Sequence, residues 1–445
     1  MSTPRMQNDP GQGATLMEAL EPRLLLSGTV WTGMDVDGDQ LTVKLSGSGT
    51  LAVTGGSNSA IGTITVNSGV ATNVLSVAVK KAPAGNGLID VGKMDILGNL
   101  KAIKAPKARI NGDAGHIGVT SPDWVGALDL YSIGAQTIVT IGPSGIPLVA
   151  PIRVTLAESA YLNSSMTFSS PISSFKAHDV LGSITSLSDI GSIKVADTMM
   201  GAITSSGEIG SISAFDGYGT WHAEGDIGKV KLKGSACTTL RVTTPGNIGA
   251  ITFAGPEAQP ALISARNLGS LKVSGNLTVS FGINLAGDAP DQICLRNLTV
   301  KGWWSGGFLR AHGSIGTVKI GGIGNARIFA GVQNSYPNYM GDNHASAVLE
   351  SVGGALSTAY IKSVVVTGKA TDPSDPSHEW NVSHPTIAAS SLLSVRLAKV
   401  DAAKDPNATI LALTLGKIVA KDINGDTYTY GQNWPAGNMQ VIQLV

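Results

Sequence analysis

The most regular feature of the chain is a pattern of polar and apolar positions that returns about every twenty residues. Each copy reads polar residue, Ile or Leu, Gly, small or polar residue, then two apolar residues that flank a polar or small one. Clear copies are GEIGSISAF (207–215), GDIGKVKLKG (225–234), GNIGAITFAG (246–255) and RNLGSLKVSG (266–275). Alternating apolar residues share one face of a β-strand, so every copy predicts a short strand with one buried face.

A glycine and a turn-forming residue keep their places in this pattern. The glycines recur 18 to 21 residues apart, at Gly191, Gly210, Gly228, Gly249 and Gly269. We predict that they let the backbone turn a corner that a Cβ atom would obstruct. The residues two positions earlier, which favour turns, are Asp189, Glu208, Asp226, Asn247 and Asn267.

A weaker second series, LGSIT (181–185) and MGAIT (200–204), indicates at least two strands in each period. A unit this short cannot bury its apolar faces alone, so successive units must stack. We therefore expect an all-β fold, a right-handed parallel β-helix with about 20 residues per coil. Equivalent residues would then lie above one another, as in the series Ile193, Ile212, Val230, Ile251 and Leu271. The alternative, a β-sandwich of short strands, would not require the same glycine in every period.

The organisation expected from this pattern has three parts. Residues 1–30 are expected to form a disordered start and a short capping segment, residues 31–420 the β-helix with its loop insertions, and residues 421–445 a C-terminal cap or tail. The repeat loosens near 325–390, where Pro, Asn, Asp and His predict loop insertions. Insertions of this kind often gather on a binding face.

Composition narrows the classes of partner. The 445 residues carry 31 basic and 31 acidic side chains, so the chain has no bulk electrostatic attraction for nucleic acid. No apolar stretch is long enough for a membrane-spanning helix, and the apolar run Leu24–Leu26 is too short for an ordinary signal peptide. Two cysteines, Cys237 and Cys294, are too few for a disulfide scaffold and are expected to be separate thiols.

One short segment resembles a known family signature. The residues LEPRLLLS (20–27) resemble the LEPR-XLL segment of large, often repetitive, surface or exported proteins of planctomycete-like bacteria. The stretch 35–55 is similar to a segment common in the same kind of protein. The resemblance implies an extracellular or cell-surface location, and it brings no activity and no catalytic residues. Taken by itself, 20–27 also suits a short amphipathic helix that caps the first coil.

Two Asp-rich turns are candidates for calcium binding. Alternate residues offer oxygen ligands around a glycine in DVDGD (35–39) and DINGD (422–426). The glycine is at the fourth position rather than the sixth of an EF-hand loop, so an EF-hand is rejected. The remaining alternative is an Asp-rich turn without an ion. The candidate ligands are Asp35, Asp37, Asp39, Asp422, Asn424 and Asp426.

Aromatic residues gather near the insertions in a chain where they make up only 5% of residues. Exposed rings could stack on sugars, or the same rings could pack the insertions onto the rod. The candidates for glycan contact are Trp303, Trp304, Tyr336, Tyr339 and Trp380.

Two further groups of polar residues are candidates for metal binding or catalysis. The HEWNVSH stretch (378–384) lacks the spacing of HExxH and predicts a surface loop. Asp189, Glu208 and Asp226 would stack about 5 Å apart, which suits paired carboxylates, but the series continues as Asn. The sequence therefore predicts no catalytic residues.

These patterns favour a non-enzymatic, cell-surface or secreted β-helix protein that acts as a spacer, adhesion or glycan-contacting element. Its partners would be extracellular polysaccharide or other envelope proteins, with no nucleic acid and no transmembrane segment. The alternative is a carbohydrate-active β-helix enzyme, a polysaccharide lyase or hydrolase. A column of Lys194, Lys231, Lys272 and Lys319 either contacts anionic polysaccharide weakly or is a solvated face.

Overall fold

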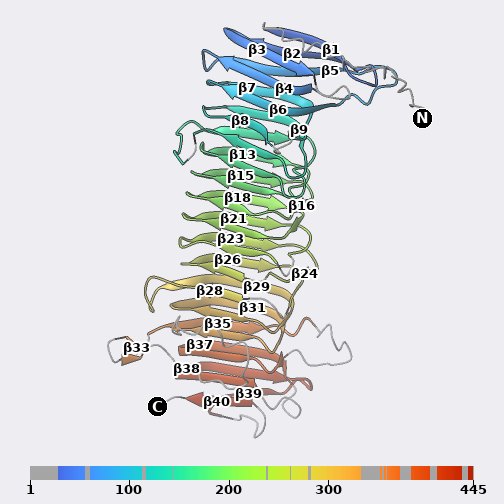
Figure 1. Ribbon diagram of the computed structural model, residues 1–445. Coiled ribbons are helices and arrows are strands. Elements are labelled where there is room, and N and C mark those ends of the chain that lie inside the picture. Colours follow the sequence, from blue (N-terminus) through green and yellow to red (C-terminus); the bar gives the residue numbers. More distant parts are fainter. Residues whose placement is uncertain are drawn as a thin grey trace, which may run out of the picture.

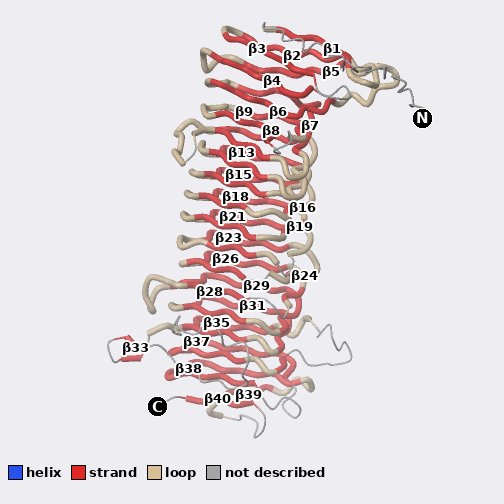
Figure 2. Tube along the Cα trace, in the orientation of Figure 1, coloured by secondary structure: helices blue, strands red, loops and turns tan. Residues whose placement is uncertain are grey.

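The computed structural model describes residues 29–55, 61–112, 117–143, 145–236, 239–260, 262–278, 282–331, 351–352, 355–356, 358–370, 382–400, 408–432 and 439–443. Over these residues the chain is all-β, with strands joined by turns and no helix (Figure 2). No helix that could cross a membrane occurs in this part of the chain. The strands stack into a long rod, with the first strands at one end and the last at the other (Figure 1).

The strands predicted from the main repeat pair with one another in parallel, layer upon layer. Ile193 is the register partner of Ile212, Ile212 of Val230, Val230 of Ile251 and Ile251 of Leu271, as predicted. The strands are β13 (Ile172–Ala177), β15 (Ile190–Val195), β18 (Ile209–Ala214), β21 (Ile227–Leu232), β23 (Ile248–Phe253) and β26 (Leu268–Val273).

This column of inward-facing register partners, called the main file below, continues toward the C-terminal end of the rod. The sequence pattern of the strands there is less clear. Leu271 pairs with Leu298, Leu298 with Val318 and Val318 with Val364. The strands are β29 (Ile293–Ser305), β31 (Ser314–Gly324), β35 (Tyr360–Val366), β37 (Thr386–Val400) and β38 (Ala408–Asp422).

The weaker second series also forms parallel strands. Ile184 pairs with Ile203, and Ile203 with Trp221, so LGSIT and MGAIT occupy equivalent places. These strands are β12 (Ser165–Phe168), β14 (Ser183–Ser186), β17 (Ile203–Ser205), β20 (Thr220–Ala223), β22 (Arg241–Thr243), β25 (Leu262–Ala265), β28 (Gly282–Leu285), β30 (Phe308–Ala311) and β32 (Arg327–Ala330). Four further strands of two residues each lie at another corner of the layers. They are β16 (Thr198–Met199), β19 (Asp216–Gly217), β24 (Glu257–Ala258) and β27 (Asn276–Leu277).

The N-terminal end differs from the predicted parallel coil starting at residue 31. There β1 pairs antiparallel with β2, β2 with β5, and β3 with β4. Short turns can join antiparallel strands, whereas a parallel pair needs a longer crossover. The strands are β1 (Val30–Met34), β2 (Gln40–Ser46), β3 (Gly49–Gly55), β4 (Ile61–Ser68) and β5 (Val74–Lys80).

Parallel pairing begins where β4 pairs with β6 and β5 with β7. The strands that lead into the regular repeats are β6 (Ile89–Leu97), β7 (Ala102–Ile110), β8 (Ile117–Ser121), β9 (Ala127–Ile133), β10 (Ile138–Ile141) and β11 (Ile152–Leu156).

The C-terminal residues are not only a tail, because β40 pairs in parallel with β38, and β39 pairs antiparallel with it. The remaining strands are β33 (Ser351–Val352), β34 (Ala355–Leu356), β36 (Val382–Ser383), β39 (Thr427–Thr429) and β40 (Met439–Gln443). Residues 332–350 and 371–381 of the region predicted to carry insertions, and the segment 20–27, lie outside the described residues.

One continuous apolar core runs inside the stack, from Leu41 near one end to Ala420 near the other. The inward residues of the main file, such as Ile193 and Val230, are fully buried. Burial of each aliphatic side chain contributes roughly 1.5–3 kcal/mol, and it depends on the layers on both sides.

The repeated glycine is required by the close approach of one layer to the next. A Cβ atom on Gly191 would lie 2.7 Å from the backbone oxygen of Ser173 in the preceding layer. On Gly210, Gly228, Gly249 and Gly269 a Cβ would approach the carbonyl oxygen of the previous glycine even more closely. The predicted obstruction of a Cβ atom is therefore confirmed; the obstructing group is a backbone carbonyl of the neighbouring layer, and Gly191 itself lies within β15.

We expect Gly191→Ala to destabilise the rod by about 1–3 kcal/mol, because the backbone of two layers must shift to admit the methyl group. Gly55→Ala is the matched control, since a Cβ on Gly55 meets nothing within 4 Å. Urea unfolding followed by circular dichroism measures both. Equal midpoints for the two variants would contradict the steric account.

Candidate functional site

The first candidate site is the turn between β1 and β2, where Asp35, Asp37 and Asp39 converge. One carboxylate oxygen from each lies within 4.8 Å of the others. The buried Asp39 accepts hydrogen bonds of 2.6 Å from the backbone N–H groups of Ala82 and Gly87. These bonds fix the turn against the loop that follows β5.

The turn itself is built by its first and last residues. The Asp39 N–H donates to Asp35 Oδ1 at 2.8 Å, and the Asp35 N–H donates to the Asp39 carbonyl at 3.1 Å. Gly38 has a φ of 87°, a conformation that side chains rarely adopt, which explains the glycine of the motif.

The surroundings of this turn shift two of its pKa values in opposite directions. Burial, followed by a hydrogen bond with Asp37, raises the pKa of Asp35 above its ordinary value. Hydrogen bonds from Asp35 and from the Asn86 N–H lower the pKa of Asp37. Asp37 Oδ1 is buried without a hydrogen-bond partner. These hard oxygen donors fit calcium.

The second Asp-rich turn, between β38 and β39, repeats the hydrogen bonds of the first. The Asp426 N–H donates to Asp422 Oδ1 at 2.8 Å, and the Asp422 N–H donates to the Asp426 carbonyl at 2.9 Å. Burial acts to raise the pKa of Asp422, but backbone hydrogen bonds, first from Asp426, hold it below its usual value. The Asn424 amide nitrogen, rather than its oxygen, faces Asp422 at 3.5 Å. The turn between β38 and β39 therefore has the geometry of a hydrogen-bonded turn.

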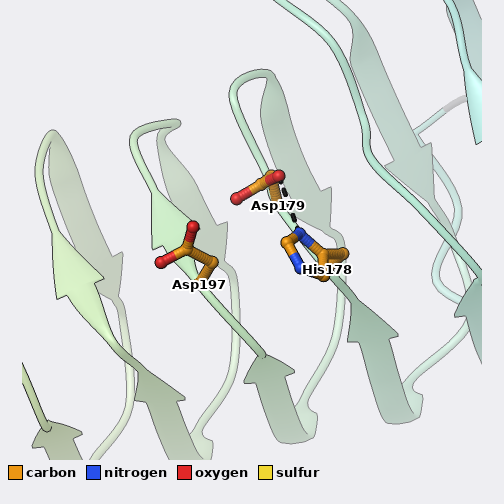
Figure 3. Close-up of side chains that lie close together, drawn as sticks. All are labelled: His178, Asp179 and Asp197. Atoms are coloured by element: carbon orange, nitrogen blue, oxygen red, sulfur yellow. Dashed lines mark hydrogen bonds and ion pairs between the residues drawn. The ribbon is translucent and has the colours of Figure 1, made fainter.

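A third cluster, His178, Asp179 and Asp197, joins two neighbouring layers at the corner beyond β13 and β15 (Figure 3). His178 Nδ1 lies 2.9 Å from Asp179 Oδ2. The same carboxylate accepts hydrogen bonds of 3.0 Å from the Ser159 hydroxyl and the Thr198 N–H. Ligand atoms of all three residues lie within 4.8 Å of one another, so the set could also bind a divalent cation.

The charges at this corner shift two pKa values in opposite directions. The hydrogen bond to Asp179 and its charge raise the pKa of His178, and the charges of Glu158 and Asp197 act the same way. Burial acts to raise the pKa of Asp179, but hydrogen bonds from His178, Thr198 and Ser159 bring it below its ordinary value.

This cluster was not predicted from the sequence. The available signal was the repeat itself. His178 and Asp179 follow the last residue of β13, and Asp197 follows shortly after the last residue of β15. Residues in matching places of successive layers should have been expected to meet.

The stacked carboxylates at the other corner act as turn residues. Asp189 Oδ1 accepts the N–H of Glu208 at 2.8 Å, and Asp226 Oδ1 accepts the N–H of Asn247 at 2.7 Å. Each therefore ties its own layer to the next.

The proposed aromatic platform is wrong for the two residues that the structure describes. Trp303 and Trp304 are only 1% and 0% exposed, so neither ring offers a face to a sugar. A Cβ on Gly324 would lie 2.8 Å from the Trp303 ring, which shows that the ring fills space left by glycine in the adjoining layer. Tyr336, Tyr339 and Trp380 lie outside the described residues, as do His378 and Glu379.

Cys294 is a free, buried thiol, and burial raises its pKa. Its environment is that of a core residue rather than a nucleophile. Cys237 lies outside the described residues.

We expect millimolar calcium to raise the melting temperature of the protein by a few degrees, because an ion bound only by the folded state stabilises it. Asp37→Asn should abolish the rise, and Asp426→Asn should preserve it. Differential scanning fluorimetry across a calcium titration measures all three proteins. A wild-type melting temperature that does not respond would remove the calcium hypothesis.

The pKa of His178 should lie above its ordinary value near 6.5 in an NMR pH titration. Asp179→Asn should lower it most and Asp197→Asn less, because only Asp179 is hydrogen-bonded to the ring. Since the folded pKa is raised, the stability contributed by His178 is complete below the unfolded pKa and is lost as pH rises through the folded pKa. An unshifted pKa, or equal effects of the two variants, would contradict this geometry.

Comparison with known proteins supplies no relative from which a role could be transferred. No family model, no curated protein and no solved structure matches the chain. What the protein does must therefore be inferred from its own residues.

Proposed function

We propose that the chain is a right-handed parallel β-helix that serves, without catalysing a reaction, as a stiff structural element of the cell surface or of a secreted assembly. The observation that carries this proposal is the unbroken register of the main file. It runs from Phe175 through Ile193 and onward to Ile418 without a change in the inward position.

Such a register supports stiffness for a simple mechanical reason. Neighbouring layers are joined by backbone hydrogen bonds that point along the rod, and the apolar core is continuous beneath them. Bending the rod must lengthen these bonds on one side and compress the core on the other. A spacer that holds other groups away from a surface needs this property.

The resemblance of residues 20–27 to the LEPR-XLL segment supports the location. The balanced charge of the chain is compatible with that setting. Adhesion or glycan contact would then be the task of the outward side chains, because the inward ones are committed to the core.

The alternative, a carbohydrate-active enzyme, would need carboxylates that converge on a substrate. The stacked carboxylates Asp189 and Asp226 are instead hydrogen-bonded to backbone N–H groups of the next layer. Their use in joining layers favours the structural role.

Cell fractionation tests the proposed location. The protein should be recovered with the envelope or the medium, and deletion of residues 20–27 should reduce that recovery. A cytoplasmic enzyme detected in the same fractions serves as the control for lysis. Recovery of the full chain in the soluble cytoplasm would overturn the proposed location.

A further inference from the structure

On seven successive strands of the main sheet the outward register partners alternate between cations and hydroxyl groups; the file begins after Lys176, itself the partner of Lys194, and is followed by Val365. We call it the lysine file. Successive register partners on β15, β18, β21, β23, β26, β29 and β31 are Lys194, Ser213, Lys231, Thr252, Lys272, Thr299 and Lys319. The alternation has no interruption over these seven strands.

The alternation sets the distance between positive charges. Adjacent strands are about 4.8 Å apart, so lysines on every second strand are about 9.6 Å apart along the rod. The four lysines are exposed, while the hydroxyl residues between them are half-buried. None of these lysines makes an ion pair among the described residues. Their charges are therefore available to a ligand.

A second outward file beside the first adds mostly small polar groups, one further lysine and no acid. Its residues, in register, are Ser192, Ser211, Lys229, Ala250, Ser270, Asn297 and Thr317. Together the two files make a flat strip of ammonium, hydroxyl and amide groups. Such groups suit a ligand that carries both negative charges and many hydroxyls.

Acidic residues border this strip on both sides. Asp189, Glu208 and Asp226 precede the strands, and Asp197 and Asp216 follow them at the next corner. A broad polyanion laid across the rod would meet these carboxylates. A narrow chain that runs along the rod axis would meet only the strip.

We propose that the lysine file binds a linear acidic polysaccharide, laid along the rod, that carries one negative charge per disaccharide. The spacing of about 9.6 Å between lysines is comparable with the length of a disaccharide unit. The hydroxyl and amide groups between the lysines bind sugar hydroxyls. This inference rests on the proposed surface role and names the ligand class for it.

Charge spacing also argues against nucleic acid as the occupant. Each strand of a DNA duplex carries a charge about every 3.4 Å, far denser than the lysine file. Each lysine contact with a polysaccharide is weak alone, and several in register add through multivalency.

The test uses purified full-length protein and hyaluronan oligosaccharides, which carry one carboxylate per disaccharide, in titration calorimetry at low salt. The test variant is Lys194→Glu, Lys231→Glu, Lys272→Glu and Lys319→Glu together. The matched control, Lys80→Glu, Lys81→Glu, Lys101→Glu and Lys107→Glu, makes the same change in net charge with exposed lysines elsewhere on the rod.

The wild type and the matched control should bind with affinities within about twofold of each other, and the test variant should bind at least about tenfold more weakly. Added salt should weaken wild-type binding. Because the four side chains point outward, the circular dichroism of the test variant should be unchanged. If the variant fails to fold, the corresponding four-fold Lys→Gln variant removes the charges without introducing repulsion.

Three outcomes would overturn the proposal: no binding by the wild type, equal loss in both variants, or equal binding of neutral dextran or of single-stranded DNA. The binding assay does not depend on where the cell places the protein. A cytoplasmic location would therefore contradict the proposed surface role while leaving the measured affinity intact. Failure of the binding assay would contradict the polysaccharide proposal while leaving the surface location intact.

Discussion

The whole structure depends on parallel pairing between layers that cannot be stable alone. A repeat of about twenty residues has too little interior to bury its own aliphatic side chains. These side chains are therefore buried only when the neighbouring layers pack against them. Ile193 and Val230 are fully buried because strands above and below cover them. Close stacking then leaves no room for a Cβ at the corner, which is why glycine recurs there.

This constraint separates the residues that hold the rod together from those free to act. Inward positions must be apolar and turn positions must supply hydrogen bonds to the next layer, as Asp189 and Asp226 do. Outward strand positions need neither an apolar side chain nor a hydrogen bond to the next layer. The regular alternation of the lysine file is therefore not required by folding, and this freedom makes its chemistry informative.

The repeat predicted the fold well and the sites poorly, for one physical reason. Backbone spacing follows from local alternation, so the file through Ile193 and the corner at Gly191 could be placed from the sequence. The burial of Trp303 could not, because it depends on glycine in another layer at positions such as Gly324. The antiparallel strands at the N-terminal end were not predicted, since the alternation in residues 61–66 is the same for either direction of pairing.

The sequence by itself determined the period, the inward file and the glycine corner, because each is a local demand that every repeat must satisfy. It also placed the two Asp-rich turns, whose hydrogen bonds join residues four positions apart. Only the tertiary structure decided which side chains from different layers meet, as at His178 and Asp197. It also showed that the lysine file continues without a break from Lys272 through Thr299 to Lys319 despite the unequal lengths of the intervening loops. Loop length changes the distance along the chain, whereas register fixes the neighbours in space.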